Sequence, residues 1–507
     1  MQASVIEWLE YTAQKYPGKE ALIDEYEKIS FAEMRRKSLA ISREILALSR
    51  EAQKPVAVYL EKSAKVLVSF IGVAYSRNFY SPIDVDMPKS RVEKILEVLQ
   101  PEIVITCREL KDNFDTFGYK GDYILYEDVI PRESDEQVVL PFAQSIIDTD
   151  LLYVLFTSGS TGVPKGVGIR HRSVIDYIDW VTEEFRITAE DSFGNQAPFY
   201  FDNSILDIYS MMKTGAALYI IPKKLFSQPV LLLEYLKENQ INTIFWVPSA
   251  LITVAKLRAL KNVDLSSVLK RVLFCGEVMP NKQLNYWRSN LPHVIYANLY
   301  GPTEITDACT FYIADREFDD DEPLPIGKPM KNTEILVLDE KDQLILCDQP
   351  GMIGELCVKG TSLAVGYYNN PEKTKAAFVQ NPLNDKYDEI IYRTGDLVMY
   401  NELGEIMYMG RKDYQIKHMG HRIELGEIET AVSSLEDIER CCCLYDESKS
   451  KIVLVVEAQT EVSKTELNQR LKEIIPEYML PGRVITIPVM PLNANGKIDR
   501  KQLKESL

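Results

Sequence analysis

Short β-branched runs alternate with amphipathic segments through the first half of the chain, and this alternation restricts the fold more than any other feature. Apolar residues recur at helical spacing over residues 6–15 and 31–48, which predicts two helices. Strands are predicted at residues 55–60, 103–106, 217–221, 243–247 and 271–275. Because strands separated by helices pair in parallel, the pattern predicts an α/β fold whose parallel sheets carry helices on both faces.

The pattern changes near Pro323, where the predicted strands become short and glycines mark the turns. Short strands separated by glycine-containing turns are typical of a β-barrel-like subdomain. A polar, glycine-containing boundary follows near residue 410. We therefore expect an N-terminal core over residues 1–410, a hinge over 411–413 and a small α+β C-terminal domain over 414–507.

A loop rich in glycine and hydroxyl residues follows a predicted buried strand at residues 151–156. Residues 157–166 read TSGSTGVPKG, with four hydroxyl side chains, three glycines and one lysine. Glycines expose backbone N–H groups to an anion, and a lysine supplies a compact charge for phosphate. Pro164 and Gly166 flank Lys165 and prevent the helix start of a Walker A loop. The segment predicts a polyphosphate site, with an ordinary surface turn as the alternative.

Composition excludes several classes of protein. The net charge of −17, from 75 acidic and 58 basic residues, argues against a nucleic-acid partner. The eight cysteines form no CxxC pair, although Cys441, Cys442 and Cys443 are adjacent, so neither a zinc site nor a disulfide framework is predicted. The N-terminus lacks the apolar run of a signal peptide, and no apolar run is long enough for a membrane span. We expect a cytoplasmic protein.

The segment LYGPTE at residues 299–304 places a Gly-Pro turn at the end of a predicted strand. Ligands of parallel α/β sheets bind where the strands end. Tyr300 offers a ring that can stack on a nucleobase, and Glu304 offers a hard oxygen ligand for Mg²⁺. Taken alone, the segment is equally compatible with an ordinary turn.

The segment YRTGD at residues 392–396 predicts a glycine turn with Asp396 at its tip. A carboxylate in this position can accept both hydroxyls of a ribose. The alternative is an aspartate that only stabilises the turn.

Two segments lie beyond the expected hinge. Residues 421–429, HRIELGEIE, predict a helix start with Glu427 and Glu429 in its first turn, where the helix dipole favours acids. Residues 495–500, NGKIDR, predict an Asn-Gly turn from which Lys497 projects. The alternative for Lys497 is a solvated surface charge.

Taken together and in this order, the five segments resemble the adenylate-forming superfamily, which includes acyl-CoA synthetases, luciferases and the adenylation domains of nonribosomal peptide synthetases. The resemblance covers essentially the whole chain. Residues 195–199 with 201–202, and residues 274–277, resemble the amino-acid-activating branch, which contains D-alanyl carrier protein ligases and stand-alone adenylation enzymes. Because we find no carrier attachment or condensation motif, we expect a free-standing enzyme that loads a separate carrier protein.

The resemblance implies two half-reactions. A carboxylate first attacks the α-phosphorus of ATP, and the thiol of a phosphopantetheinylated carrier protein then attacks the acyl-adenylate. Lys497 is the implied catalytic residue, Thr161 and Glu304 the implied Mg²⁺ ligands, and Asp413 the hinge about which the mobile domain rotates. The implied ATP-binding residues are Thr157, Ser158, Gly159, Ser160, Thr161, Gly162, Lys165, Gly276, Glu277, Asn298, Tyr300, Gly301, Thr303, Asp396 and Arg411.

The resemblance also implies an amino-acid pocket formed by Asp202, Asn203, Leu206, Phe245, Leu273, Cys275, Leu299, Asp307 and Ala308. Asp202 would pair with the α-ammonium of the substrate, with capping of a helix over 205–212 as the alternative. Cys275 matches the D-alanine branch, whereas Asn203, Leu299 and Asp307 depart from it. Asp307 either meets a polar substrate side chain or bonds Asn203 or Thr306.

The leading hypothesis is therefore an ATP-dependent amino acid:carrier protein ligase that uses Mg²⁺. An acyl- or aryl-CoA ligase is the alternative enzyme, and a catalytically silent adenylate-binding or scaffold protein is the alternative outside catalysis. We expect a monomer, because no additional interaction segment is visible in the sequence.

Overall fold

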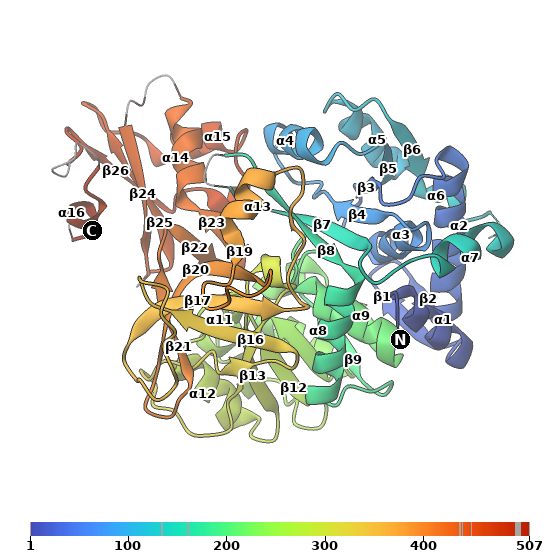
Figure 1. The fold of residues 1–507 in the computed structure, drawn as a ribbon, viewed down its shortest axis with the longest axis horizontal. Helices are drawn as coiled ribbons and strands as arrows, with labels where there is room; N and C mark the ends of the chain where they lie inside the picture. The colour runs from blue at the N-terminus through green and yellow to red at the C-terminus, as the bar shows by residue number, and fades with distance from the viewer. Residues whose placement is uncertain are drawn as a thin grey trace. The chain divides into compact units, whose positions relative to one another are not determined.

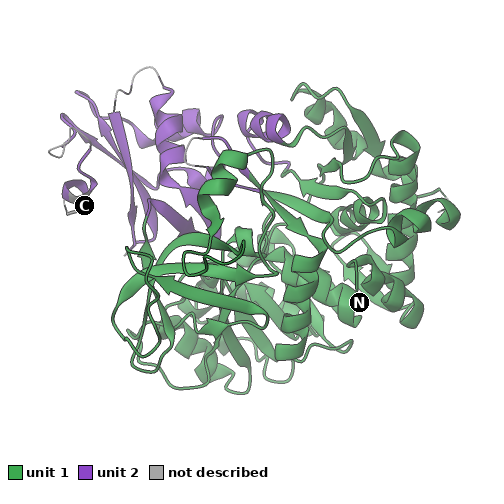
Figure 2. Ribbon diagram, viewed as in Figure 1, with its two compact units in different colours: residues 1–84, 99–155, 166–412 green, residues 85–98, 156–165, 413–507 purple. Residues whose placement is uncertain are grey.

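A computed structural model of the chain describes residues 2–132, 135–159, 162–435, 438, 440–447, 449–491 and 498–505 of the 507. The chain forms two compact units (Figure 2). Unit 1 comprises Met1–Asp84, Leu99–Leu155 and Gly166–Lys412, and unit 2 comprises Val85–Val98, Phe156–Lys165 and Asp413–Leu507. The division at Asp413 falls within the expected hinge, but the two short earlier segments of unit 2 were not anticipated from the sequence.

A nine-stranded sheet dominates unit 1, and its central strands are parallel (Figure 1). The helices predicted at the N-terminus are confirmed as α1 (Ile6–Lys15) and α2 (Phe31–Leu48). The predicted strands are also confirmed, and several end one or two residues early. The sheet order is β15 (Lys328–Pro329), β14 (Thr310–Ile313), β13 (Ile295–Tyr300), β12 (Arg271–Phe274), β11 (Thr243–Trp246), β9 (Ser192–Asn195), β10 (Ala217–Ile220), β1 (Glu20–Ile23) and β2 (Lys28–Ser30).

Helices cover both faces of this sheet, as the alternation of strands and helices predicts. One face packs on α8 (His171–Glu184) and α9 (Ser204–Thr214). The opposite face packs on α10 (Pro229–Glu238), α11 (Pro248–Lys256) and α12 (Asn281–Asn290). Central strands such as β11 and β12 are therefore buried on two sides, which explains their nearly continuous apolar sequence.

A second, seven-stranded sheet carries the end of the glycine-rich loop. Its order is β18 (Gly366–Tyr367), β8 (Lys165–Arg170), β7 (Leu151–Thr157), β4 (Phe79–Pro82), β3 (Pro55–Val58), β5 (Ile103–Thr106) and β6 (Asp122–Leu125). β8 begins at Lys165, so the loop is followed by a strand and not by a helix. This agrees with the prediction that the loop is not a Walker A loop. The remaining helices of this part of unit 1 are α3 (Ala64–Tyr75), α5 (Arg108–Asp115), α6 (Tyr126–Val129) and α7 (Glu136–Gln144).

The β-barrel-like subdomain is an antiparallel five-stranded sheet. It contains β16 (Thr333–Leu338), β17 (Ile353–Gly360), β20 (Ile390–Tyr400), β19 (Phe378–Gln380) and β21 (Ile406–Arg411), with α13 (Pro371–Ala377) preceding β19. β17 and β20 have 8 and 11 residues, so the prediction that strands become short here is wrong for these two. The pairing of β17 with β20, and that of β20 with β21, contains register shifts. At such a shift a strand can include a glycine and continue in the same direction.

Unit 2 is an α+β unit with its own apolar core. Its strands are β22 (Gln415–His418), β23 (His421–Glu424), β24 (Arg440–Asp446), β25 (Lys451–Glu457) and β26 (Arg483–Ile487). Its helices are α4 (Lys89–Leu99), α14 (Leu425–Ser433), α15 (Lys464–Leu471) and α16 (Arg500–Glu505). Cys441, Cys442 and Cys443 lie in β24, where they are buried as part of this unit's interior.

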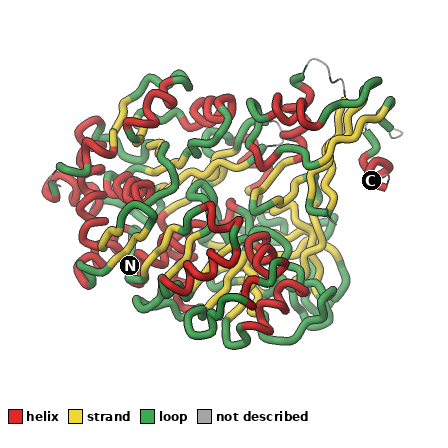
Figure 3. Tube along the Cα trace, turned by 180° about the vertical axis from the view of Figure 1, so that it is seen from behind, coloured by secondary structure: helices red, strands yellow, loops and turns green. Residues whose placement is uncertain are grey.

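Figure 3 shows helices and strands interleaved along the trace, in keeping with the α/β class. Within the described ranges of the chain, no helix combines the length and the apolar character needed to cross a membrane.

Candidate functional site

Strand register places most of the expected pocket residues on one face of the nine-stranded sheet. Phe245 pairs with Leu273, and Leu273 pairs with Ala297. Cys275 and Leu299 follow two residues after Leu273 and Ala297, so they point to the same side. This face belongs to a core that contains Leu206, Phe245, Leu273, Cys275, Leu299 and Ala308. Strand register therefore brings four of the expected pocket residues together: Phe245, Leu273, Cys275 and Leu299.

Asp202 lies two residues before α9. The helix begins at Ser204, and its N-cap, Asn203, makes no side-chain capping hydrogen bond. The Asp202 carboxylate accepts a hydrogen bond from the Asn203 N–H at 3.1 Å. Helix capping therefore does not account for Asp202, although the predicted helix itself is confirmed.

Asn203 presents an amide group beside Gly276. Asn203 is 8% exposed, and its buried Nδ2 has no hydrogen-bond partner among the described residues. Gly276 has φ +97°, and a Cβ there would lie about 4.0 Å from the Asn203 amide. The positive φ favours glycine at this position, next to a buried amide that has no hydrogen-bond partner among the described residues.

Asp307 bonds a residue that the sequence analysis missed. The hydroxyl of Tyr177, on α8, donates a hydrogen bond to Asp307 Oδ2 at 2.6 Å. Tyr177 is fully buried and Asp307 is 1% exposed. The expected alternative partners, Asn203 and Thr306, are therefore wrong. Tyr177 belongs to an apolar helix stripe and lies 130 residues from Asp307 in the sequence, so no local signal could have identified it.

Burial raises the pKa of the Tyr177 hydroxyl well above its ordinary value, and Asp307, Cys275 and Asp202 raise it further. Burial likewise raises the pKa of Tyr153, and Asp202 and Asp307 add to that effect. Both tyrosines are fully buried, and their hydroxyls remain protonated at neutral pH.

The backbone before Ala308 is strained. Thr306 and Asp307 have φ values of +62° and +75°, although neither is glycine. Such conformations cost about 1–3 kcal/mol each and persist where the surroundings determine them, often at functional sites. The Thr306 hydroxyl donates to the carbonyl of Ser362 at 2.7 Å, which holds the segment in place.

Asp396 forms a buried network with Arg411 and Tyr300. Arg411 donates to Asp396 Oδ1 at 3.0 Å and to the carbonyl of Thr394 at 2.8 Å, and the Tyr300 hydroxyl donates to Asp396 Oδ2. Asp396 is 2% exposed. Burial, and then the Asp396 charge, raises the pKa of Tyr300 well above its ordinary value. The hydroxyl therefore remains a donor at neutral pH.

The expected turn around Asp396 is wrong. Asp396 lies inside β20, where it pairs with Arg411 of β21. Gly395, with φ +73°, belongs to an irregular stretch of that strand rather than to a chain reversal. A glycine next to an aspartate fits both structures, so the motif alone could not distinguish them.

Glu304 is fully buried next to the Gly-Pro turn. The Tyr367 hydroxyl donates to its Oε1 at 2.7 Å, a partner from another sheet that the sequence did not indicate. Within the described ranges, no cluster of three or more ligating side chains could hold a metal. A single carboxylate fits Mg²⁺ that is held mainly by phosphates, since this ion keeps waters and few protein ligands.

The other expected nucleotide residues of unit 1 lie near the same strand ends. Asn298 donates to the carbonyl of Pro325 at 2.9 Å, and Glu277 accepts from the Ser249 N–H at 2.9 Å. Thr303 is 8% exposed. A Cβ on Gly301 would meet Ala308 Cα at 2.6 Å, so only glycine fits against the strained segment.

The donors of the glycine-rich loop, within unit 2, hold carboxylates. Lys165 forms an ion pair with Glu424 at 3.2 Å, and the Gly159 N–H donates to Glu427 Oε2 at 3.2 Å. Ser158 donates to the carbonyl of Arg422 at 2.8 Å. The buried hydroxyl of Thr157 has no hydrogen-bond partner among the described residues. The loop therefore presents donors to anionic groups, as a phosphate site requires.

Glu427 and Glu429 do more than stabilise a helix start. Arg91 of α4 forms an ion pair with Glu427, and both side chains are 4% exposed. Glu429 lies beyond the first turn of α14, where it bonds Arg500 and accepts from the Cys443 N–H at 2.6 Å. The expected first-turn position is confirmed for Glu427 and wrong for Glu429, and ion pairs hold both glutamates in addition.

Three expected site residues, Ser160, Thr161 and Lys497, lie outside the described residues. The hinge residue Asp413 is described, and its carboxylate accepts from the Gln415 N–H at 3.2 Å.

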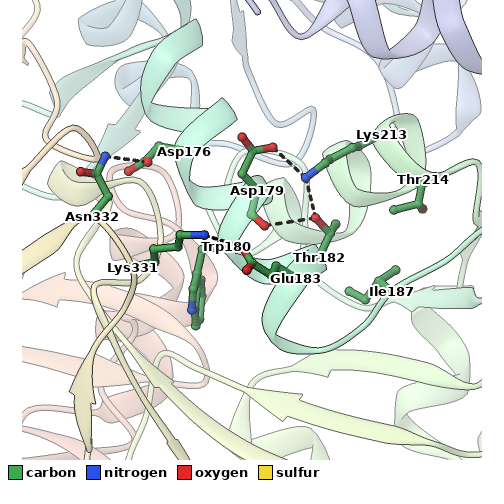
Figure 4. A pocket seen from close by; sticks show the side chains of 10 residues that line it. All are labelled: Asp176, Asp179, Trp180, Thr182, Glu183, Ile187, Lys213, Thr214, Lys331 and Asn332. Atoms are coloured by element: carbon green, nitrogen blue, oxygen red, sulfur yellow. Dashed lines mark hydrogen bonds and ion pairs between the residues drawn. The ribbon is translucent and has the colours of Figure 1, made fainter. Parts of the chain in front are cut away.

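A pocket of about 780 Å³ on unit 1 involves none of the expected site residues (Figure 4). It lies along α8 and includes Lys213 and Lys331. Lys213 pairs with Asp179 at 2.7 Å and Lys331 pairs with Glu183 at 2.6 Å. Both lysines of the pocket therefore already have carboxylate partners, and the Asp176 carboxylate accepts from Asn332 and Thr361.

Comparison with protein families gives two matches. Residues 9–368 match a model described as AMP-binding enzyme, and residues 427–497 match one described as AMP-binding enzyme C-terminal domain.

Individual proteins are similar over nearly the whole chain. Tyrocidine synthase 1 of Brevibacillus parabrevis is 32% identical over 505 residues, covering 99% of this chain and 45% of the relative. A D-alanine–D-alanyl carrier protein ligase of Bacillus licheniformis is 30% identical over 515 residues, covering 99% of both proteins. The adenylation domain AlmE of Vibrio cholerae, solved with glycyl-adenosine-5'-phosphate, has a TM-score of 0.85 at 22% identity, covering 100% of this chain and 98% of AlmE.

Proposed function

The chain belongs to the AMP-binding enzyme family, and we propose that it activates an amino acid as aminoacyl-AMP and transfers it to the thiol of a carrier protein. The D-alanyl carrier protein ligase supports this proposal, because it matches from end to end. The chain spans less than half of tyrocidine synthase 1, however, so the activity of that larger protein is not transferred.

One observation chiefly supports the proposal: an expected pocket residue and an expected nucleotide residue are neighbours at the end of β13. Leu299 belongs to the apolar core that also contains Cys275, and the next residue, Tyr300, bonds Asp396. In the proposed reaction, the substrate carboxylate lies between its own α-ammonium at Asp202 and the ribose at Asp396. A single strand end would thus align the attacking oxygen with the α-phosphorus.

Asp202 favours an amino acid over a fatty or aryl acid. The α-ammonium of an amino acid would give the Asp202 carboxylate a charge-assisted hydrogen bond. A fatty or aryl acid has no group that could make this contact. The alternative, an acyl- or aryl-CoA ligase, is therefore less well supported.

Nucleotide binding would use the network at β20 and the glycine-rich loop. Asp396 already accepts from Tyr300 and Arg411, but a carboxylate has about four acceptor sites and retains capacity for ribose hydroxyls. Arg411 keeps Asp396 oriented for this contact. In this structure, Lys165 and the Gly159 N–H bind the carboxylates of Glu424 and Glu427. When ATP binds, these two donors would bind its phosphates instead.

Adenylate formation brings a carboxylate and a triphosphate together, so charge must be neutralised. Each donor directed at developing charge contributes about 2.7–4 kcal/mol to transition-state stabilisation. Mg²⁺ bound to the phosphates would supply further neutralisation, with Glu304, and by resemblance Thr161, as protein ligands. Lys497 is proposed to bridge the carboxylate and the α-phosphate. Rotation about Asp413 would then remove this lysine and admit the carrier thiol.

The partner is proposed to be a separate phosphopantetheinylated carrier protein, and the enzyme is proposed to act as a monomer. We place the reaction in the cytoplasm, where thiols stay reduced, because all eight cysteines are free.

The test is ATP–pyrophosphate exchange with every proteinogenic amino acid in both stereochemical forms, beside fatty and aryl acids. The proposal predicts exchange with one or a few amino acids and none with acids lacking an ammonium. Exchange only with fatty or aryl acids, followed by transfer to free coenzyme A, would support the alternative enzyme instead.

The Lys497→Ala variant separates the two half-reactions. It is expected to lose exchange almost completely while still transferring a supplied aminoacyl-AMP to the carrier. Equal loss of both steps in a folded variant would remove Lys497 from the proposed role.

A further inference from the structure

We propose that Lys94, on α4 of unit 2, is a positioning residue for the triphosphate, because it holds one peptide group of the glycine-rich loop in the orientation that binds phosphate. The inference deepens the proposed function and rests on it. Its basis is a hydrogen bond that the Lys94 ammonium donates to the Gly162 carbonyl at 2.9 Å. No part of α4 belongs to the segments from which the sequence analysis predicted the site.

Lys94 meets the loop inside one compact unit. Unit 2 contains both Val85–Val98 and Phe156–Lys165. A Cβ on Gly162 would lie 3.8 Å from Lys94 Nζ and 3.3 Å from Cγ2 of Thr430, so the ammonium lies against the glycine itself. Gly162 has φ +72°, a conformation that favours glycine. Lys94 therefore binds the loop at the residue with the greatest conformational freedom.

The other two basic residues in the first half of α4 are neutralised by carboxylates, and Lys94 is not. Lys89 pairs with Glu93 at 3.8 Å, and Arg91 pairs with Glu427. Among the residues that the structure describes, Lys94 forms no ion pair, and its ammonium donates one hydrogen bond, to the loop carbonyl. Its positive charge therefore strengthens the attraction of the loop for an anion.

The hydrogen bond fixes the direction of a whole peptide group. A peptide is planar and trans, so the N–H of Val163 points away from the Gly162 carbonyl. If this peptide rotated, the negative end of its dipole would replace the N–H on the side that the N–H now faces. A cation on the carbonyl oxygen opposes that rotation, since a charge-assisted hydrogen bond would be lost.

The residue that Lys94 binds also closes the turn that carries an anion-binding N–H. The Gly162 N–H donates to the Gly159 carbonyl at 2.8 Å. The Gly159 N–H donates to Glu427 Oε2 at 3.2 Å, a contact that a phosphate oxygen would replace. Lys94 therefore stabilises the far end of a turn whose first residue holds an anionic oxygen. Such preorganisation lowers the cost of binding the triphosphate.

The first experiment compares three substitutions of Lys94 in pyrophosphate exchange with varied ATP. Lys94→Met keeps a long side chain without charge, and KM for ATP should rise about tenfold, the effect of losing one hydrogen bond from a charged donor. Lys94→Gln keeps a neutral donor and should have an intermediate KM, whereas Lys94→Arg keeps a cation and should remain close to the wild type. The kcat, the KM for the amino acid and the transfer of a supplied aminoacyl-AMP should change little in all three.

The second experiment is calorimetric titration, which needs no amino acid. Lys94→Met should bind α,β-methylene-ATP with Mg²⁺ about tenfold more weakly than the wild type. It should bind AMP as the wild type does, because AMP lacks the β- and γ-phosphates that the loop is proposed to hold. Lys89→Met is the matched control: it makes the same substitution on the same helix at an exposed lysine, and should keep both affinities.

Unchanged affinity for the ATP analogue in folded Lys94→Met would overturn the inference, and so would an equal loss of affinity for the analogue and AMP. If Lys94→Met does not fold, Lys94→Gln tests the same contact with a smaller expected shift. Selective weakening of the analogue in a protein that exchanges with no amino acid would support the inference and contradict the proposed function.

Discussion

The proposed preference for an amino acid depends chiefly on Asp202. Asp202→Asn keeps the shape but removes the charge that the α-ammonium is expected to meet. The kcat/KM for the preferred amino acid should fall by about 10- to 100-fold, as expected for a hydrogen bond to a charged group worth about 1.5–3 kcal/mol. Pyrophosphate exchange measures this loss.

Asp179→Asn provides the control, since Asp179 is an exposed partner of Lys213 on the pocket away from the site. Its exchange rate should match the wild type. Equal rates for Asp202→Asn and the wild type would show that Asp202 does not meet the ammonium.

The sequence identified candidate residues that lie in recognisable motifs. It missed the residues that bond them from distant parts of the chain. The pocket residues follow from strand ends and from the resemblance to the family. Tyr177, Tyr367 and Arg91 each bond a site residue from a distant element, at sequence separations of 130, 63 and 336. Their own neighbourhoods are ordinary helix and strand patterns, so only the tertiary structure could reveal them.

Among the elements, the glycine-rich loop is held by an ion pair that should compete with ATP. Lys165 and Glu424 are 12% and 11% exposed. Glu424→Gln should lower the KM for ATP about two- to fivefold, because an ion pair of about 0.4–1 kcal/mol no longer occupies the lysine. Steady-state kinetics with varied ATP tests this expectation, and an increased KM would mean that Glu424 assists binding.

The ion pair between α4 and α14 should stabilise unit 2. Removal of one partner from a buried pair costs about 3–5 kcal/mol, because the other charge remains unpaired. Arg91→Ala should therefore lower the melting temperature markedly, and Arg91→Met combined with Glu427→Leu should restore much of it. The exposed pair of Lys472 and Glu477 supplies the control: Lys472→Ala should change calorimetric melting little. Equal melting of Arg91→Ala and the control would contradict this assignment.

Helices and strands were predicted well where the periodicity was strong and poorly where glycine was the only signal. α1, α2 and the central parallel strands lie at the predicted positions. By contrast, the expected turn at Asp396 is part of an 11-residue strand. Glycine permits a bulge as readily as a reversal, and the pairing partners in β17 and β21 decide between them.

For the whole molecule, buried ionisable groups in unit 1 make stability depend on pH. Burial raises the pKa of Asp207 to about 8 and lowers that of Lys62 to about 7. Asn195 Nδ2 donates a hydrogen bond to Asp207 Oδ2 at 3.0 Å. Between about pH 4 and 7 the folded chain retains a proton on Asp207 that the unfolded chain loses, so the free energy of unfolding falls as pH rises.

Asp207→Asn removes this dependence, since an amide does not titrate in this range. From pH 5 to pH 7, the melting temperature of the variant should rise steadily relative to the wild type. Parallel melting curves across this range would contradict a protonated Asp207 in the folded protein.

At the scale of the whole molecule, the sequence predicted the division into two units only in part. The family resemblance implied a mobile domain after residue 413, and the contacts divide the chain at that point. The inclusion of residues 85–98 and 156–165 in unit 2 depends on the Arg91–Glu427 pair and on the hydrogen bonds of Ser158. Such long-range contacts leave no periodic trace in the sequence.

The most direct test of the account is a single-turnover reaction of the purified protein with ATP, Mg²⁺ and its preferred amino acid, analysed by mass spectrometry. The account predicts an aminoacyl-adenylate in an amount comparable to the enzyme, with pyrophosphate as the other product. Consumption of ATP to ADP, or no mixed anhydride with any amino acid tested, would contradict it.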